Sequence, residues 1–128
     1  MKLTTKSEYC LLAMLYLARH EKNGFIKIEE ICRLIKLFGI KSLRVKMDRN
    51  VEANRESMKN VVSILGYDCD LRLDSNGVWD AELAFLHVPI IKAYNVRVVE
   101  EPMDMDDPGF PAFAEKMLSM GIMLMACQ

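Results

Sequence analysis

The feature that most constrains this fold is a hydrophobic period that switches back and forth from residue 41 onward. Apolar and charged side chains alternate along residues 41–47 and again along residues 69–74, a period of two that is typical of strands. Residues 96–100 and 122–127 are two further apolar, strand-like segments. Between these segments, apolar side chains recur at helical spacing in three places: residues 51–65, 80–94 and 110–119. The sequence therefore predicts strands and helices in strict alternation.

Such alternation favours right-handed strand–helix–strand units that build a parallel sheet. One face of the predicted strands carries charge, with Arg44 and Lys46 on the first strand and Arg72 and Asp74 on the second. In a doubly wound sheet helices cover both faces, so these charges would be buried. The interior of a barrel, in contrast, holds polar side chains near its mouth. We therefore predict an α/β fold, a partial (β/α) barrel of about four parallel strands with intervening helices.

One or two helices are expected before the first strand. Residues 5–20 have apolar side chains at helical spacing, "FIKI" at 25–28 is a short extended piece, and residues 29–37 are predicted to form a second helix. Farther along, Pro89 lies inside the predicted helix 80–94. It is expected to kink or shorten that helix, because proline removes a backbone donor and its ring clashes with the preceding turn.

The distribution of charge suggests two parts with different histories or partners. Residues 1–50 carry 11 Lys and Arg against 5 Asp and Glu, whereas residues 51–128 carry 6 against 13. The net charge of −1 conceals this asymmetry. We predict an N-terminal helical segment at residues 1–37 and a half barrel at residues 38–128.

Composition excludes several classes of protein. Hydrophobic residues make up 52% of the chain, which is incompatible with wholesale disorder. No apolar run reaches the roughly 18 residues of a membrane span, and the N-terminus lacks the pattern of a signal peptide. The cysteines show no paired metal-ligand spacing, so reduced thiols in a cytoplasmic protein are expected. They are Cys10, Cys32, Cys69 and Cys127.

Polar side chains gather where the predicted strands end. The carboxyl ends of parallel strands meet at one edge of a sheet, which is where such folds place their chemistry. Carboxylates are hard ligands that suit Mg²⁺, and two neighbouring carboxylates repel each other unless a cation lies between them. The groups at the four strand ends are Arg44-x-Lys46, Asp74-x-Asn76, Glu100–Glu101 and Cys127–Gln128. A divalent-metal site is therefore one hypothesis for this edge.

Four motifs in this order resemble the enolase superfamily, in particular its muconate-lactonizing and mandelate-racemase-like branches. They are "GIKSLRVKM", "DCDLRLDSNGVWDAELA", "YNVRVVEEPMDMDD" and "GIMLMACQ", and together they cover strands 2 to 5 of that barrel. The resemblance implies a Mg²⁺-dependent racemase or cycloisomerase that acts on a small-molecule acid.

The resemblance also implies roles for single residues. Lys46 is the proton-abstracting lysine, with Arg44 as the cation beside it. Asp74 and Glu100 are metal ligands, and Asn76 and Glu101 lie next to them. The third ligand should be an acid at position 127 followed by a glutamate, but the sequence has Cys127 and Gln128.

That departure lowers the expected activity. A thiol is a poor ligand for Mg²⁺, and glutamine lacks the missing negative charge. We therefore expect a truncated or recombined half barrel with weak divalent-metal binding and no turnover on its own. A half barrel also has two open sheet edges and an uncovered face, which favour association, so a homo-oligomer is expected.

A different resemblance covers the N-terminus. "MKLTTKSEYCLLAMLYLARHEKNGFIKIEEIC", residues 1–32, resembles the start of the IscR-like winged-helix transcription regulators. It implies a DNA-binding regulator as an alternative function, with "KSLRVKMDRNVEAN" as its recognition helix. The wing is missing, and the acidic remainder opposes attraction to DNA, so DNA is the less favoured partner. A third alternative is an engineered chimera without an evolved function.

Overall fold

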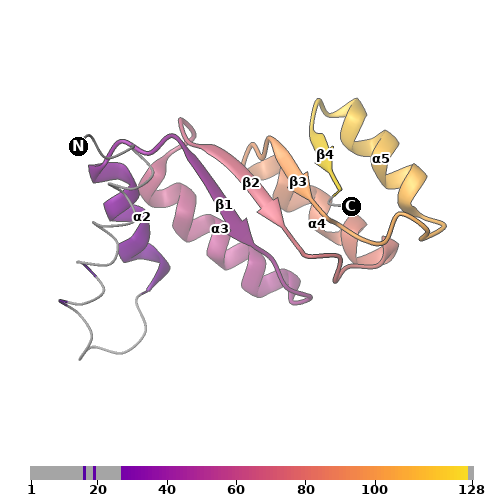
Figure 1. Cartoon of the computed structure of the whole chain (residues 1–128), viewed down its shortest axis with the longest axis horizontal. Coiled ribbons are helices and arrows are strands. Elements are labelled where there is room, and N and C mark those ends of the chain that lie inside the picture. The colour runs from indigo at the N-terminus through magenta and orange to yellow at the C-terminus, as the bar shows by residue number, and fades with distance from the viewer. Residues whose placement is uncertain (1–15, 17–18, 20–26, 127–128) are drawn as a thin grey trace, which may run out of the picture.

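A computed structural model of the chain describes residues 16, 19 and 27–126 (Figure 1). Helices and strands alternate after the first helix, as the change of hydrophobic period predicts. The elements with their bounds are α2 Ile28–Leu37, β1 Ser42–Lys46, α3 Val51–Leu65, β2 Asp70–Asp74, α4 Ala81–Ala93, β3 Val98–Glu100, α5 Phe110–Ser119 and β4 Met123–Met125. Most of the helix expected at residues 5–20 lies outside the described residues.

The four strands form one parallel sheet in the order β1-β2-β3-β4. Each connecting helix therefore moves the chain one strand along in the same direction, without the reversal of strand order that defines a doubly wound sheet. Figure 1 shows α3 and α4 on the same side of the sheet. The expected α/β fold, a partial (β/α) barrel, is confirmed.

The hydrophobic core lies between the sheet and its helices. Leu71, Leu73 and Val99 point to this side and are almost completely inaccessible to solvent. They pack with apolar side chains of the three helices that follow the strands, namely Met58 and Val61 of α3, Ile90 and Ile91 of α4, and Phe113 and Met117 of α5. Fully burying side chains of this size contributes roughly 1.5–3 kcal/mol each.

Local capping explains where α3 and α4 begin. The side chain of Asn50 accepts a hydrogen bond from the Ala53 amide, and that of Asp80 accepts one from the Leu83 amide. Each cap satisfies one of the backbone donors that a helix leaves unpaired in its first turn. Helix α3 ends at Gly66, whose φ of 72° is a conformation that glycine adopts without steric cost. The caps fix the lengths of the loops that follow β1 and β2.

Helix α4 spans Ala81–Ala93 and continues through Pro89, so the expected helix at 80–94 is shorter by one residue at each end, and the kink at Pro89 stays a prediction. Two expectations about single elements need correction. Ile28, expected in an extended piece, already belongs to α2. Residues 41–54 are not a recognition helix, since they form β1 and the start of α3. The alternating charges of this segment belong to a strand.

Two further observations concern composition. Cys32 and Cys69 are buried free thiols, and burial raises the pKa of both. Within the described part of the chain, every helix is too short or too polar to cross a membrane.

Candidate functional site

The last residues of three successive strands lie side by side on the open face of the sheet. Lys46 is in register with Asp74, and Asp74 is in register with Glu100. Adjacent strands lie about 4.8 Å apart, so side chains in one register row point the same way and are near neighbours. The structure thus brings together three of the residues that the sequence singled out. They form a row of one cation and two carboxylates.

Asp74 is buried, with 3% of its surface exposed. Burial by itself disfavours its ionised form, but it is outweighed by hydrogen bonds from Lys46 Nζ to Oδ2 at 2.6 Å and from the Asn76 amide to Oδ1 at 3.0 Å. Together with the charges of Lys46 and Arg44, these hydrogen bonds lower the pKa of Asp74. Asp74 is therefore a carboxylate at neutral pH.

Arg44 lies one row behind and reaches forward to both carboxylates. Its Nη1 is 3.0 Å from Glu100 Oε2 and 3.6 Å from Asp74 Oδ2. Glu100 is also buried, with 8% of its surface exposed. The guanidinium accordingly bridges two buried negative charges on neighbouring strands. We define Arg44, Lys46, Asp74 and Glu100 as the strand-end cluster.

Asn76 connects the cluster to the loop after β2. Its Oδ1 accepts a hydrogen bond from Lys46 Nζ at 2.6 Å, and its backbone has a φ of 50°, in the left-handed region. Asparagine tolerates this conformation better than most residues. The Lys46 ammonium group is therefore oriented by two hydrogen bonds that it donates, one to Asp74 and one to Asn76.

The loops after β2 and β3 are joined by backbone contacts. Ser75 Oγ donates to the carbonyl oxygens of Glu101, at 2.7 Å, and Pro102, at 3.1 Å. The amide of Gly77 donates to Glu101 O, and the amide of Glu101 donates to Met125 O at the end of β4. Glu101 itself has a φ of 42°. Its backbone thus holds three strand ends together.

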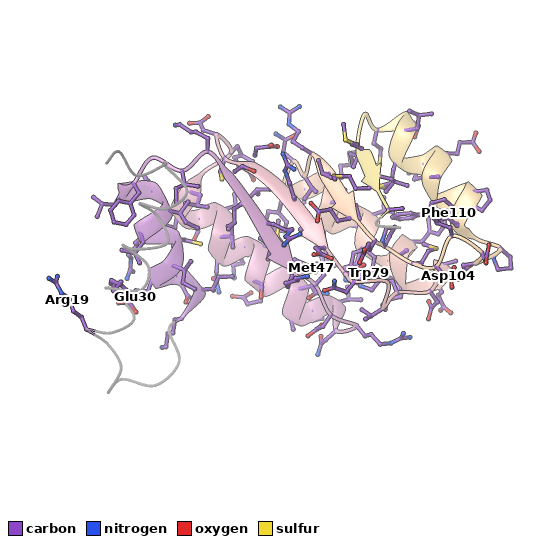
Figure 2. The ribbon with its side chains drawn as sticks, viewed as in Figure 1. Arg19, Glu30, Met47, Trp79, Asp104 and Phe110 are labelled. Atoms are coloured by element: carbon purple, nitrogen blue, oxygen red, sulfur yellow. The ribbon has the colours of Figure 1, made fainter. Side chains whose placement is uncertain are left out.

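A cavity of about 380 Å³ opens beside Glu101, between the ends of β3 and β4. Its apolar wall includes Met103, Phe110 and Leu124, and its polar part includes Glu101 and Asp104. In Figure 2, Met47, Trp79 and Asp104, from the loops that follow three successive strands, succeed one another across the molecule. Glu101, in the wall of the cavity, directly follows Glu100 of the strand-end cluster.

A buried polar network connects the loop after β1 with α3, α4 and Trp79. The sequence analysis did not predict it. Asn54 Nδ2 is 2.9 Å from His87 Nε2 and also donates to the carbonyl oxygen of Asp48. His87 Nδ1 is 2.8 Å from Leu83 O, so Nδ1 carries the proton. Trp79 stacks on the His87 ring with centroids 4.1 Å apart, and its Nε1 donates to Asp48 O. The network fixes the loop after β1.

Burial lowers the pKa of His87, since the charged imidazolium loses its hydration there. The sequence shows His87 only as an isolated histidine on an apolar helix. Its partners lie 33 and 8 residues away in Asn54 and Trp79, a separation that carries no local signal.

The described residues fit part of a divalent-metal site. The two carboxylates of Asp74 and Glu100 are hard oxygen donors on adjacent strand ends, which is the chemistry that Mg²⁺ prefers. Within residues 16, 19 and 27–126, no three side chains of His, Cys, Asp or Glu gather closely enough to hold a metal ion. The sequence-predicted positions Cys127 and Gln128 lie outside the described residues.

Comparison with known families agrees with the fold and with the order of the motifs. The family described as "Enolase C-terminal domain-like" matches residues 27–126. The chain therefore belongs to this family. The match begins inside the predicted N-terminal segment 1–37, and the division at residue 37 remains a prediction.

Individual relatives also match this chain, each over part of its own length. The hydrophobic dipeptide epimerase of Enterococcus faecalis V583 is 29% identical over 69 residues, which are 54% of this chain and 20% of that protein. A crystal structure of dipeptide epimerase from the same organism has a TM-score of 0.67 at 22% identity and matches 80% of this chain and 30% of its own. Another structure of that epimerase contains Mg and the dipeptide L-Leu-L-Tyr.

Human mitochondrial enolase superfamily member 1 has a TM-score of 0.69 at 18% identity, and the match covers 80% of this chain and 24% of the human chain. The chain thus spans about a fifth of the curated relative and a quarter to a third of these two solved structures. At this level of identity the structures establish the fold, and activity is a separate question.

Proposed function

We propose that the strand-end cluster is a weak divalent-metal site and that the 128-residue chain does not catalyse turnover on its own. The observation that carries this proposal is the register of Asp74 with Glu100, which puts two carboxylates on neighbouring strand ends of a sheet that belongs to the enolase C-terminal domain-like family. By resemblance, the metal is Mg²⁺.

The donor set explains why binding should be weak. Asp74 and Glu100 supply two charged ligands, whereas a tight Mg²⁺ or Ca²⁺ site has more oxygen donors or a substrate phosphate. By resemblance the third position is Cys127, a soft donor that Mg²⁺ disfavours. We expect a dissociation constant on the order of millimolar. A bound divalent cation would supply charge to stabilise an anionic form of a carboxylate substrate.

Lys46 is the residue of this chain that we propose as the proton-accepting group. Lys46 is the last residue of β1, and 58% of its side chain is exposed, so a small-molecule acid can approach its Nζ. Lys46 Nζ donates hydrogen bonds to Asp74 and Asn76, which orient the group and occupy two of its three donor hydrogens. Arg44 is the neighbouring cation. These roles follow from the family resemblance together with the distances above.

The proposed function is tested by calorimetric titration of the 128-residue chain with Mg²⁺. We expect weak binding that is lost in both Asp74→Asn and Glu100→Gln. Arg49 forms a surface ion pair with Asp80 at 2.9 Å, and neither residue belongs to the cluster, so Asp80→Asn is a matched control that should leave Mg²⁺ binding unchanged. Incubation with L-Leu-L-Tyr and Mg²⁺ should give no epimerised dipeptide. Mg²⁺ binding that survives both cluster variants contradicts the assignment.

We further propose that the chain forms a homo-oligomer. The sheet leaves β1 and β4 unpaired on their outer sides within the described residues, and Met123 and Met125 of β4 are 61% and 38% exposed. Unpaired strand edges and exposed apolar side chains favour association. Light scattering after size exclusion should give at least twice the monomer mass of 14.7 kDa. A monodisperse monomer at high concentration contradicts this proposal.

The regulator-like alternative depends on residues 1–32, most of which lie outside the described residues. It remains a prediction, and the part of it that assigned a recognition helix to residues 41–54 is wrong, as described above.

A further inference from the structure

We propose that Arg44 is the resident counter-cation of the Asp74–Glu100 pair and that a divalent cation must displace its guanidinium to bind there. This inference deepens the proposed function and rests on it for the identity of the cation that displaces the guanidinium. Its structural half, the pairing of one guanidinium with two carboxylates, stands on the geometry alone.

The two carboxylates need a positive charge between them. Asp74 and Glu100 are register partners on adjacent strands, and both are buried, so water screens their repulsion poorly. Arg44 Nη1 lies within 3.0 Å of a Glu100 oxygen and 3.6 Å of an Asp74 oxygen. One nitrogen thus contacts the same pair of groups that a bridging cation would contact.

The two acids depend on Arg44 to different degrees. Asp74 has a second cationic partner in Lys46, at 2.6 Å. Among the residues that the structure describes, Glu100 has one cation within ion-pair distance, which is Arg44. Removal of Arg44 should therefore affect Glu100 most, because it leaves a buried carboxylate without a countercharge.

The guanidinium is also able to leave. The Arg44 side chain is 56% exposed, so it can swing toward solvent and be hydrated there, whereas the carboxylates stay buried. Only the Arg44 end of the pair is exposed, so the guanidinium regains its hydration when it leaves, whereas the buried carboxylate needs a new countercharge. A divalent cation carries twice the charge of the guanidinium, so it can replace Arg44 while the fold is retained.

The test uses charge removal with the side-chain stem retained. Arg44→Met removes the guanidinium, and Arg72→Met is the matched control. Arg72 lies in the same register row on the next strand, but its ion pair is with Asp70, at 3.5 Å. Mg²⁺ titration should show about tenfold tighter binding or better in Arg44→Met, the effect of removing one competing charge, and less than about twofold change in Arg72→Met.

A metal-free measurement separates this inference from the proposed function. In urea unfolding with a chelator present, Glu100→Gln should lower the midpoint in the parent chain, because it breaks the pair with Arg44. The same substitution should raise the midpoint in the Arg44→Met background, because it removes an unpaired buried charge. This reversal of sign is not expected from two residues that merely contribute to packing.

The outcomes are distinguishable. Mg²⁺ affinity that is unchanged or weaker in Arg44→Met overturns the inference while leaving the metal site itself intact. A shift of the same sign in both backgrounds also overturns it. Absence of Mg²⁺ binding in parent and variant, together with the sign reversal, rejects the proposed metal function and supports the assignment of Arg44 as counter-cation.

Discussion

The two faces of the sheet are built from alternate residues of the same strands but follow different physical rules. On the covered face, Leu71, Leu73 and Val99 lose almost all of their solvent-accessible surface under the helices. On the open face, Arg44 and Lys46, which flank the buried Val45 of β1, expose more than half of their side chains. The strands therefore carry an apolar side that determines the fold and a charged side on which these two cations stay accessible.

This difference shows where the chain tolerates change. The covered face gains its stability from apolar contacts that have no substitute, so any loss of volume there leaves a cavity. The open face gains little from its exposed ion pairs, yet it cannot lose one charge without leaving another uncompensated. The proposed metal site therefore lies on the face that contributes least to folding.

The largest expected effect sharpens the contrast between the faces. Leu73→Ala should lower the free energy of unfolding by about 2–5 kcal/mol, because it opens a cavity in the centre of the core. Arg72→Ala, on the neighbouring position and opposite face, should lower it by about 1 kcal/mol or less. Urea unfolding measures both values. Equal losses in the two variants contradict the assignment of the faces.

The next effect concerns the degenerate ligand position. Cys127→Asp should add a third carboxylate to the strand-end cluster and tighten Mg²⁺ binding tenfold or more, about 1.4 kcal/mol. Calorimetric titration of the variant and parent measures the difference. Cys69→Asp is unsuitable as a control, since that cysteine is buried in the core, so Cys127→Asn serves instead. A folded Cys127→Asp variant with unchanged Mg²⁺ affinity indicates that the three strand ends do not converge.

A smaller effect tests whether the polar network below the cluster belongs to the rigid side of the molecule. The pKa of His87 is lowered in the folded protein, whereas the unfolded chain takes up a proton near pH 6.5. The unfolded state then binds more protons as pH falls below about 6.5, so stability is lost in that direction and is fully present above it. The loss grows as pH falls further below 6.5, by at most about 1.4 kcal/mol per pH unit.

The measurement is urea unfolding at pH 7.5 and 5.5 for the parent and for His87→Phe. The variant should lose stability at pH 7.5, because Asn54 loses its partner, but its further loss on acidification should be smaller than that of the parent. An identical pH dependence in both chains means that other groups cause the loss.

Local patterns in the sequence were sufficient for most of the fold. The bounds of α3 and α5 coincide with the helical spacing of residues 51–65 and 110–119, because capping and apolar periodicity are both short-range signals. The charged alternation also indicated a barrel rather than a doubly wound sheet, since side chains on one face of a strand must share one environment. These properties depend on neighbours in the chain.

The arrangement of the site depends on contacts between strands, and here prediction was incomplete. The motifs placed Lys46, Asp74 and Glu100 at strand ends, but not the bridge that Arg44 makes across two strands. The stack of Trp79 on His87 and the backbone role of Glu101 were likewise outside reach. Each depends on which side chain lies opposite after the strands pair, and no local pattern encodes it.

The most direct test of the central claim is the location of a bound divalent ion. Mn²⁺, titrated into ¹⁵N-labelled chain, broadens the amide signals of residues near it. We expect the strongest broadening at Ser75, Asn76 and Glu101, which follow the two carboxylates, and weaker broadening at Asp70 and Arg97, roughly 10–13 Å farther along the strands. Broadening that is instead confined to the acidic loop at Asp104–Asp107, or spread evenly over the chain, contradicts a metal site at the strand-end cluster.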